Sequence, residues 1–125
     1  MEPTTIKVRS FGDLRVWQIA HQLALAIYQI TKNFPHEERY GLTSQLRRAV
    51  VSIAANIAEG SKRPSTKDLC HFLDIAQGSN EEVKCLLMLS RDLHYMPSDQ
   101  FVGLFEKSEA IGAMLNGLLQ SLRFP

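Results

Sequence analysis

The chain has 125 residues, of which 45% are hydrophobic and 22% charged, and these values suit one folded domain. Fourteen basic and thirteen acidic side chains give a net charge of +1. This balance argues against a dedicated nucleic-acid-binding protein, which usually has a basic excess. It is still compatible with a local basic patch on the surface.

The first ten residues, MEPTTIKVRS, are expected to form a flexible arm (1–10) ahead of one domain (11–125). They contain no apolar run, so they do not resemble a signal peptide. The longest uncharged stretch, between Arg15 and Lys32, is shorter than the ~20 residues that a membrane span needs. We therefore expect a cytoplasmic protein without membrane contact.

Proline-containing breaks at 33–41, 59–65 and 94–99 divide the domain into four long segments with helical periodicity. No run of alternating β-branched residues competes with them. The four helices are expected at about 13–33, 42–60, 65–93 and 98–122. Short connections between long helices favour antiparallel neighbours, so the sequence predicts an all-α fold, an antiparallel up-down-up-down four-helix bundle.

Two helix ends carry recognisable signals. Gly60 is expected to end the second helix, because glycine is common directly after a helix C-terminus. Ser65 and Asp68 have the spacing of a capping box, in a weaker form with Asp in place of Glu, at the start of the third helix.

Each of the first two helices has a core-facing stripe of apolar residues at three- and four-residue spacing. The stripe of the first helix contains Val16, Ile19, Ala20, Leu23, Ile27 and Ile30. The stripe of the second helix contains Leu42, Leu46, Ala49, Ile53 and Ile57.

Both helices also carry a second apolar sector outside this stripe, which exceeds what a bundle helix needs. Small residues let another helix approach closely, and Trp and Tyr are favoured interface anchors. The sector therefore predicts self-association, while the alternative is that both helices lie deep inside a small bundle. The predicted interface consists of Trp17, Ala24, Tyr28, Val51, Ala54 and Ala58.

A narrow polar seam lies beside the core stripe of the second helix. Because apolar residues flank it on both sides, we expect partial burial and a hydrogen-bonded network that includes Arg48, Ser52 and Glu59. The alternatives are a solvated face or a ligand site. The seam consists of Gln45, Arg48, Ser52, Asn56 and Glu59.

Basic residues cluster where the second helix gives way to the third. Lys62, Arg63 and Lys67 are the candidate nucleic-acid contacts, with Arg47 as a supporting contact earlier on the second helix. Three positive charges near a turn are also common on ordinary protein surfaces. A ring would repeat the cluster in every subunit, so weak contacts could add up to useful avidity.

The segments DLRVWQIA, YGLTSQLRRAVVSIAANIAEGSKR and FLDIAQGSNEEV resemble a bacterial family of four-helix bundles named for proteins encoded in intervening sequences of 23S rRNA genes. The resemblance covers about residues 11–122, and its most specific part ends in Asn56-Ile57-Ala58-Glu59-Gly60. The family is similar to the accessory protein of diversity-generating retroelements.

The resemblance implies an up-down bundle that assembles as a ring of five subunits, without enzymatic activity. It also implies nucleic-acid binding, which is known for the retroelement relatives. The family name alone does not make ribosomal RNA the target. The positions that match the family motif are Gln45, Arg48, Ser52, Asn56, Glu59, Gly60, Gly78, Ser79 and Glu82.

No catalytic, metal-binding or cofactor-binding pattern emerges from the sequence. The serines have no evident His–acid partnership, the four histidines are scattered, and no glycine-rich loop that could hold phosphate is present. Cys70 and Cys85 lack zinc spacing and lie about 22 Å apart along one expected helix, so we expect two free thiols. We therefore expect no enzyme, no metal and no cofactor.

Two functions remain open at this point. The first is a homo-oligomer, with a pentamer favoured, that binds RNA or DNA as an accessory factor. The second is an oligomeric scaffold that binds a protein partner. The resemblance and the basic cluster favour the first, and the near-neutral charge favours the second.

Overall fold

The computed structural model describes residues 11–125, and the expected arm at 1–10 lies outside this part of the chain. Two 3-10 turns, Phe11–Asp13 and His36–Glu38, accompany four α-helices, and residues 11–125 contain no strand. The helices are α1 (Arg15–Thr31), α2 (Leu42–Ser61), α3 (Thr66–Asp92) and α4 (Ser98–Arg123).

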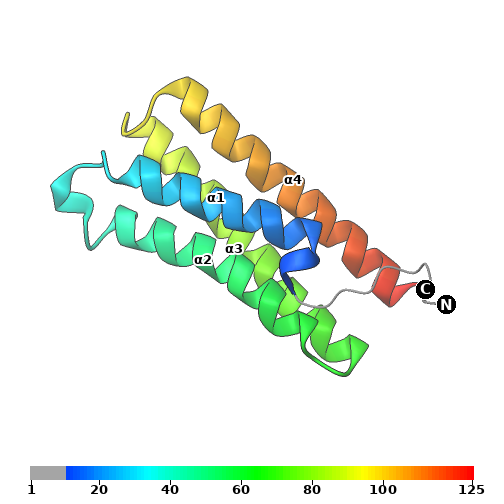
Figure 1. Ribbon diagram of the computed structural model, residues 1–125. Helices are drawn as coiled ribbons and strands as arrows, with labels where there is room; N and C mark the ends of the chain where they lie inside the picture. Colours follow the sequence, from blue (N-terminus) through cyan, green and yellow to red (C-terminus); the bar gives the residue numbers. More distant parts are fainter. Residues whose placement is uncertain (1–10) are drawn as a thin grey trace.

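The helices run alternately up and down, and each packs against its neighbours in the chain (Figure 1). The bundle closes where α4 packs against α1. The predicted all-α four-helix bundle is therefore confirmed. Its core consists of the predicted apolar stripes of α1 and α2, all buried, together with residues of α3 and α4 such as Leu87 and Ile111.

The helix ends follow from local chemistry. Ser65 caps α3, because its side chain accepts a hydrogen bond from the backbone N–H of Asp68 at 3.1 Å, as the sequence predicts. Glu38 acts at the start of α2, where its carboxylate accepts from the N–H of Leu42 at 3.0 Å. His94 follows α3 with a φ of 62°, a left-handed conformation that ends the helix.

Gly60 does not end α2, so that prediction is wrong. The helix continues through Ser61, and Gly60 does not have a positive φ. Gly60 is buried, and a Cβ at this position would lie 2.9 Å from Cβ of Phe72 on α3. The glycine is therefore needed for the close approach of α2 and α3.

Candidate interaction surfaces

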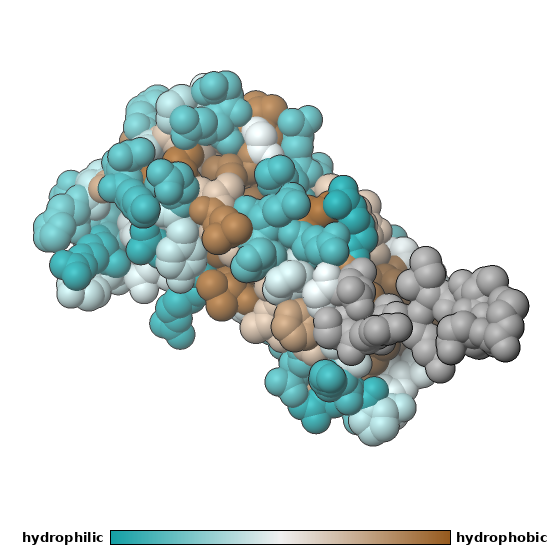
Figure 2. Space-filling view, in the orientation of Figure 1, coloured by the Kyte–Doolittle hydropathy of each residue, from teal (hydrophilic) through white to brown (hydrophobic). Residues whose placement is uncertain are grey.

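An apolar groove of about 490 Å³ lies between α1 and α2 on the outside of the bundle. Figure 2 shows hydrophobic residues at the surface over the middle of these two helices. Leu25, Tyr28 and Val51 are 60%, 42% and 44% exposed, which is high for apolar side chains of this size. The groove is lined by Phe11, Trp17, His21, Ala24, Leu25, Tyr28, Val51, Ala54, Ala55 and Ala58, a set termed the α1–α2 groove.

All six residues of the predicted interface line this groove, so the structure brings them together. They are not all in the core: Val51 is exposed, and Ala54 and Ala58 are partly buried. Four further lining residues lie outside the predicted interface: Phe11, His21, Leu25 and Ala55. Ala55 could have been found, because it lies four residues after Val51 on the same side of α2. Phe11 could not, because only the 3-10 turn places it there.

Aromatic stacking orders one end of the groove. The ring of Trp17 stacks on the ring of His21, with centroids 4.8 Å apart and planes 12° apart. Phe11 packs edge-on against Trp17, with ring centroids 5.0 Å apart. Aromatic side chains held in this way offer contact area with little further loss of conformational freedom.

Arg47 contacts the groove residue Tyr28 and does not lie in the basic cluster. Its guanidinium lies 4.6 Å from the ring centroid of Tyr28, and its Nε donates to Oγ1 of Thr31 at 2.8 Å. About 22 Å of helix separates it from Lys62. The structure therefore places Arg47 with the apolar groove and away from the other candidate nucleic-acid contacts.

The basic cluster is only partly free. Lys62 and Lys67 are exposed near the turn between α2 and α3. Arg63 forms an ion pair with Glu59 one turn earlier, and its guanidinium lies 4.9 Å from the ring centroid of Phe72. Within the basic cluster, Lys62 and Lys67 therefore form no ion pair with any residue that the structure describes and could bind phosphate.

The polar seam is built differently from the expected network. Ser52 and Ser79 join α2 to α3 through a hydrogen bond of 2.8 Å between their hydroxyls, and Asn56 donates to the hydroxyl of Ser52 at 3.0 Å. Arg48 is exposed and outside this network, and Glu59 pairs with Arg63 instead. The expected link between Arg48, Ser52 and Glu59 is therefore not formed.

A shallow recess of about 360 Å³ lies over this serine pair. It is lined by Gln45, Arg48, Ala49, Ser52, Ser79 and Glu82. Gly78, next to Ser79, is exposed on α3, with nothing within 4 Å of the position that a Cβ would take.

The 23S rRNA-intervening sequence protein family has a model that matches residues 12–117. The chain belongs to this family. No curated protein is significantly similar to the chain.

A solved structure shares the fold of this chain. It is the crystal structure of a protein of unknown function from the S23 ribosomal protein family of Bacteroides thetaiotaomicron. The TM-score is 0.76 at 24% sequence identity, and the match covers 84% of this chain and 98% of that one.

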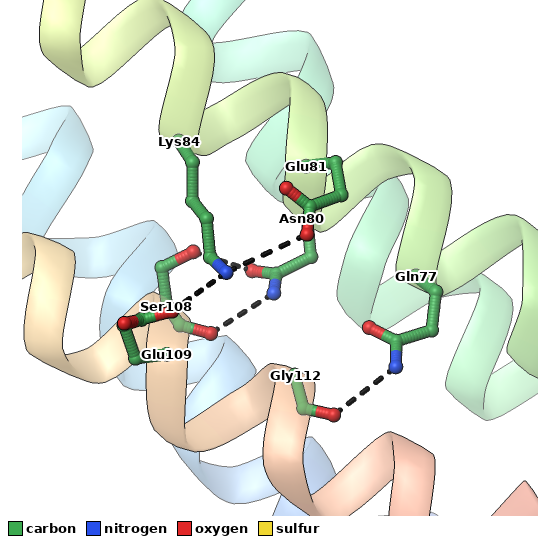
Figure 3. Close-up of polar contacts among 7 residues, drawn as sticks. All are labelled: Gln77, Asn80, Glu81, Lys84, Ser108, Glu109 and Gly112. Atoms are coloured by element: carbon green, nitrogen blue, oxygen red, sulfur yellow. Dashed lines mark hydrogen bonds and ion pairs between the residues drawn. The ribbon is translucent and has the colours of Figure 1, made fainter.

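A polar network between α3 and α4 escaped sequence reasoning (Figure 3). Asn80 donates to the carbonyl of Ser108 at 2.9 Å, and the hydroxyl of Ser108 donates to Oδ1 of Asn80 at 2.7 Å. Gln77 donates to the carbonyl of Gly112 at 3.0 Å. Beside them, hydrogen bonding to Glu109 raises the pKa of Lys84 and keeps this amine positively charged.

No group of three or more His, Cys, Asp and Glu residues between 11 and 125 is placed to hold a metal ion. None of the described helices combines the length and the apolar character of a membrane span. Cys70 is buried and Cys85 is exposed, and both are free thiols.

Proposed function

We propose that this protein is a non-enzymatic scaffold that assembles with copies of itself through the α1–α2 groove. The observation that carries the proposal is the groove itself, in which both helices expose apolar and aromatic residues. A ring of five subunits is the expectation that follows from the family resemblance.

Burial against a partner would stabilise the exposed apolar side chains of the groove, and the interface must be large enough to offset the cost of association. Fully burying a Leu or Val side chain stabilises a protein by about 1.5–3 kcal/mol, and the partly exposed Leu25 and Val51 can each gain a share of this. Association costs about 4–15 kcal/mol in lost translational and rotational freedom, so a few side chains do not suffice. The rigid Trp17–His21 stack and the small Ala54 add contact area at low entropic cost.

The test is a charge placed in the groove. We expect Ala54→Arg to lower the mass measured by light scattering while circular dichroism shows an unchanged helix content, because the new cation has no partner in an apolar interface. Ala55→Arg is a second variant at an exposed lining position, in case Ala54 tolerates no large side chain. Val102→Arg, on an exposed position of α4, is the control. Unchanged mass for both groove variants would refute this role of the groove.

Nucleic-acid binding is the second candidate function. It is favoured by Lys62 and Lys67, two exposed lysines close together at one end of the bundle, which a ring would repeat in every subunit. The ion pair between Arg63 and Glu59 and the net charge of +1 weaken it. We expect modest, sequence-tolerant binding carried by phosphate contacts.

The salt dependence of binding tests this second function. Each phosphate contact on duplex DNA adds about 0.9 to the slope of log affinity against log salt. We expect replacement of Lys62, Arg63 and Lys67 by Gln to flatten this slope and to weaken binding to unrelated sequences, with the oligomer intact. No binding of RNA or DNA at low salt would leave the protein scaffold as the function.

A further inference from the structure

The outer side of α3 carries a second exposed apolar surface, separate from the α1–α2 groove. Ile75 is 38% and Leu89 47% exposed, and Cys85 is exposed between them. Gly78 and Glu82 lie on the same face of α3 as these three residues. The five residues are spaced alternately three and four positions apart, which is typical of a helix face that packs along another helix. These five residues are termed the α3 ridge.

We infer that the α3 ridge of one copy of this chain inserts into the α1–α2 groove of the next copy. The inference rests on the proposed self-association and names its second surface. It also gives a role to Gly78 and Glu82, two motif residues that are exposed on α3.

Shape supports this pairing. The ridge of one helix can pack into the groove between two other helices, as ridges and grooves do in packed helices. At a rise of 1.5 Å per residue the ridge is about 21 Å long from Ile75 to Leu89, and the groove wall from Trp17 to Tyr28 is about 17 Å long. The bare backbone at Gly78 permits a close approach to small groove residues such as Ala54.

An arginine beside the groove and a glutamate on the ridge carry opposite charges. The groove residues include no Asp, Glu, Lys or Arg, and Glu82 is the charged residue of the ridge. Arg47, which contacts the groove residue Tyr28, and Glu82 form no ion pair with any residue that the structure describes. A ridge seated in the groove brings these opposite charges into the same interface.

Two different surfaces make the contact head-to-tail. Such an interface closes into a ring when the rotation between neighbours fits, and it never completes itself in a symmetric dimer. Consequently, a chain with a blocked groove still has a working ridge, and a chain with a blocked ridge still has a working groove. Mixing two such chains restores one interface only.

The experiment uses Ala54→Arg to block the groove and Leu89→Arg to block the ridge. We expect each variant alone to have the mass of one chain, 14.1 kDa, in light scattering. An equimolar mixture is expected to reach twice that mass and no more. Val102→Arg, at a position 50% exposed on α4 and outside both surfaces, is the matched control and keeps the wild-type mass. Circular dichroism confirms that each variant is folded.

The outcomes separate the two proposals. If Leu89→Arg keeps the wild-type mass, or if the mixture stays at 14.1 kDa, the ridge is not the second surface, while the effect of Ala54→Arg still supports the groove. A wild-type protein of 14.1 kDa refutes the self-association on which both rest. Glu82→Arg is a second ridge variant should Leu89→Arg not fold, and it is expected to reduce the mass in the same direction.

Discussion

Asn80 and Ser108 satisfy each other's hydrogen-bonding groups in the interior between α3 and α4. Both residues are fully buried, and two hydrogen bonds of 2.9 Å and 2.7 Å connect them. Polar groups without water must find partners, so this pair favours the one register of the two helices in which it forms.

Removal of either partner should therefore destabilise the bundle. We expect Ser108→Ala to lower the free energy of unfolding by about 1–3 kcal/mol, because the amide of Asn80 loses its hydroxyl donor. Urea denaturation of the wild type, Ser108→Ala, Asn80→Ala and the double variant, all at one fixed protein concentration, gives a double-mutant cycle. Strictly additive effects of the two changes would show that the pair is not coupled.

The loops at one end of the bundle are joined by a carboxylate, which makes stability there dependent on pH. Glu38 accepts from the N–H of Leu42 and, at 2.8 Å, from the hydroxyl of Tyr95. These hydrogen bonds lower the pKa of Glu38 below its ordinary value of 4.5. Because the pKa of Glu38 is lowered, its carboxylate stabilises the fold above pH 4.5. This stabilisation is lost as the pH falls through the pKa of Glu38 in the folded protein.

We expect Glu38→Gln to be less stable than the wild type near neutral pH and equally stable in acid. Thermal unfolding at a series of pH values measures the difference, with Glu106→Gln, an exposed carboxylate on α4, as the control. A difference that stays constant into acid would show that the Glu38 carboxylate is not the cause. The hydrogen bond between Tyr95 and Glu38 also raises the pKa of Tyr95. The contribution of the Tyr95 hydroxyl to stability is therefore lost only in strong alkali.

Gly60 tests the close approach of α2 and α3. Glycine in a helix normally costs about 0.5–1 kcal/mol relative to alanine. At Gly60 we expect the opposite effect. Gly60→Ala should lower the free energy of unfolding by about 1–3 kcal/mol, because the new Cβ would lie 2.9 Å from that of Phe72. Gly117→Ala on α4, with nothing within 4 Å, is the matched control and should be stabilising. Stabilisation by both changes would contradict the packing described.

The seam should depend on its serines and not on its arginine. We expect Arg48→Ala to change the free energy of unfolding by less than about 0.5 kcal/mol, because Arg48 is exposed and outside the hydrogen-bond network. Ser52→Ala removes the bond to Ser79 and should cost about 0.5–1.5 kcal/mol. Equal losses in the two variants would mean that Arg48 stabilises the fold through contacts that the single chain does not show.

The periodicity of the sequence is sufficient to predict the four helices and the apolar sectors that line the groove. Helical spacing is a local property, so the core stripe and the sector containing Trp17 and Val51 can be found on each helix separately. Gly60 was misread, because a helix-ending glycine and a close-packing glycine look the same in one sequence. Only the neighbour, Phe72 on the next helix, distinguishes them.

Pairings between distant residues could not be predicted in the same way. Asn80 and Ser108 are 28 positions apart, and no motif connects them. Arg47 was grouped with Lys62 by charge, although the structure holds its guanidinium over Tyr28 at the far end of α2. Such contacts depend on the register between helices, which is a tertiary property.

The mass of the wild-type protein in solution tests the central claim most directly. Light scattering or sedimentation equilibrium at tens of micromolar should give several times the chain mass of 14.1 kDa, with five chains as the expectation from the family resemblance. A mass of 14.1 kDa over the whole concentration range would contradict self-association through the α1–α2 groove.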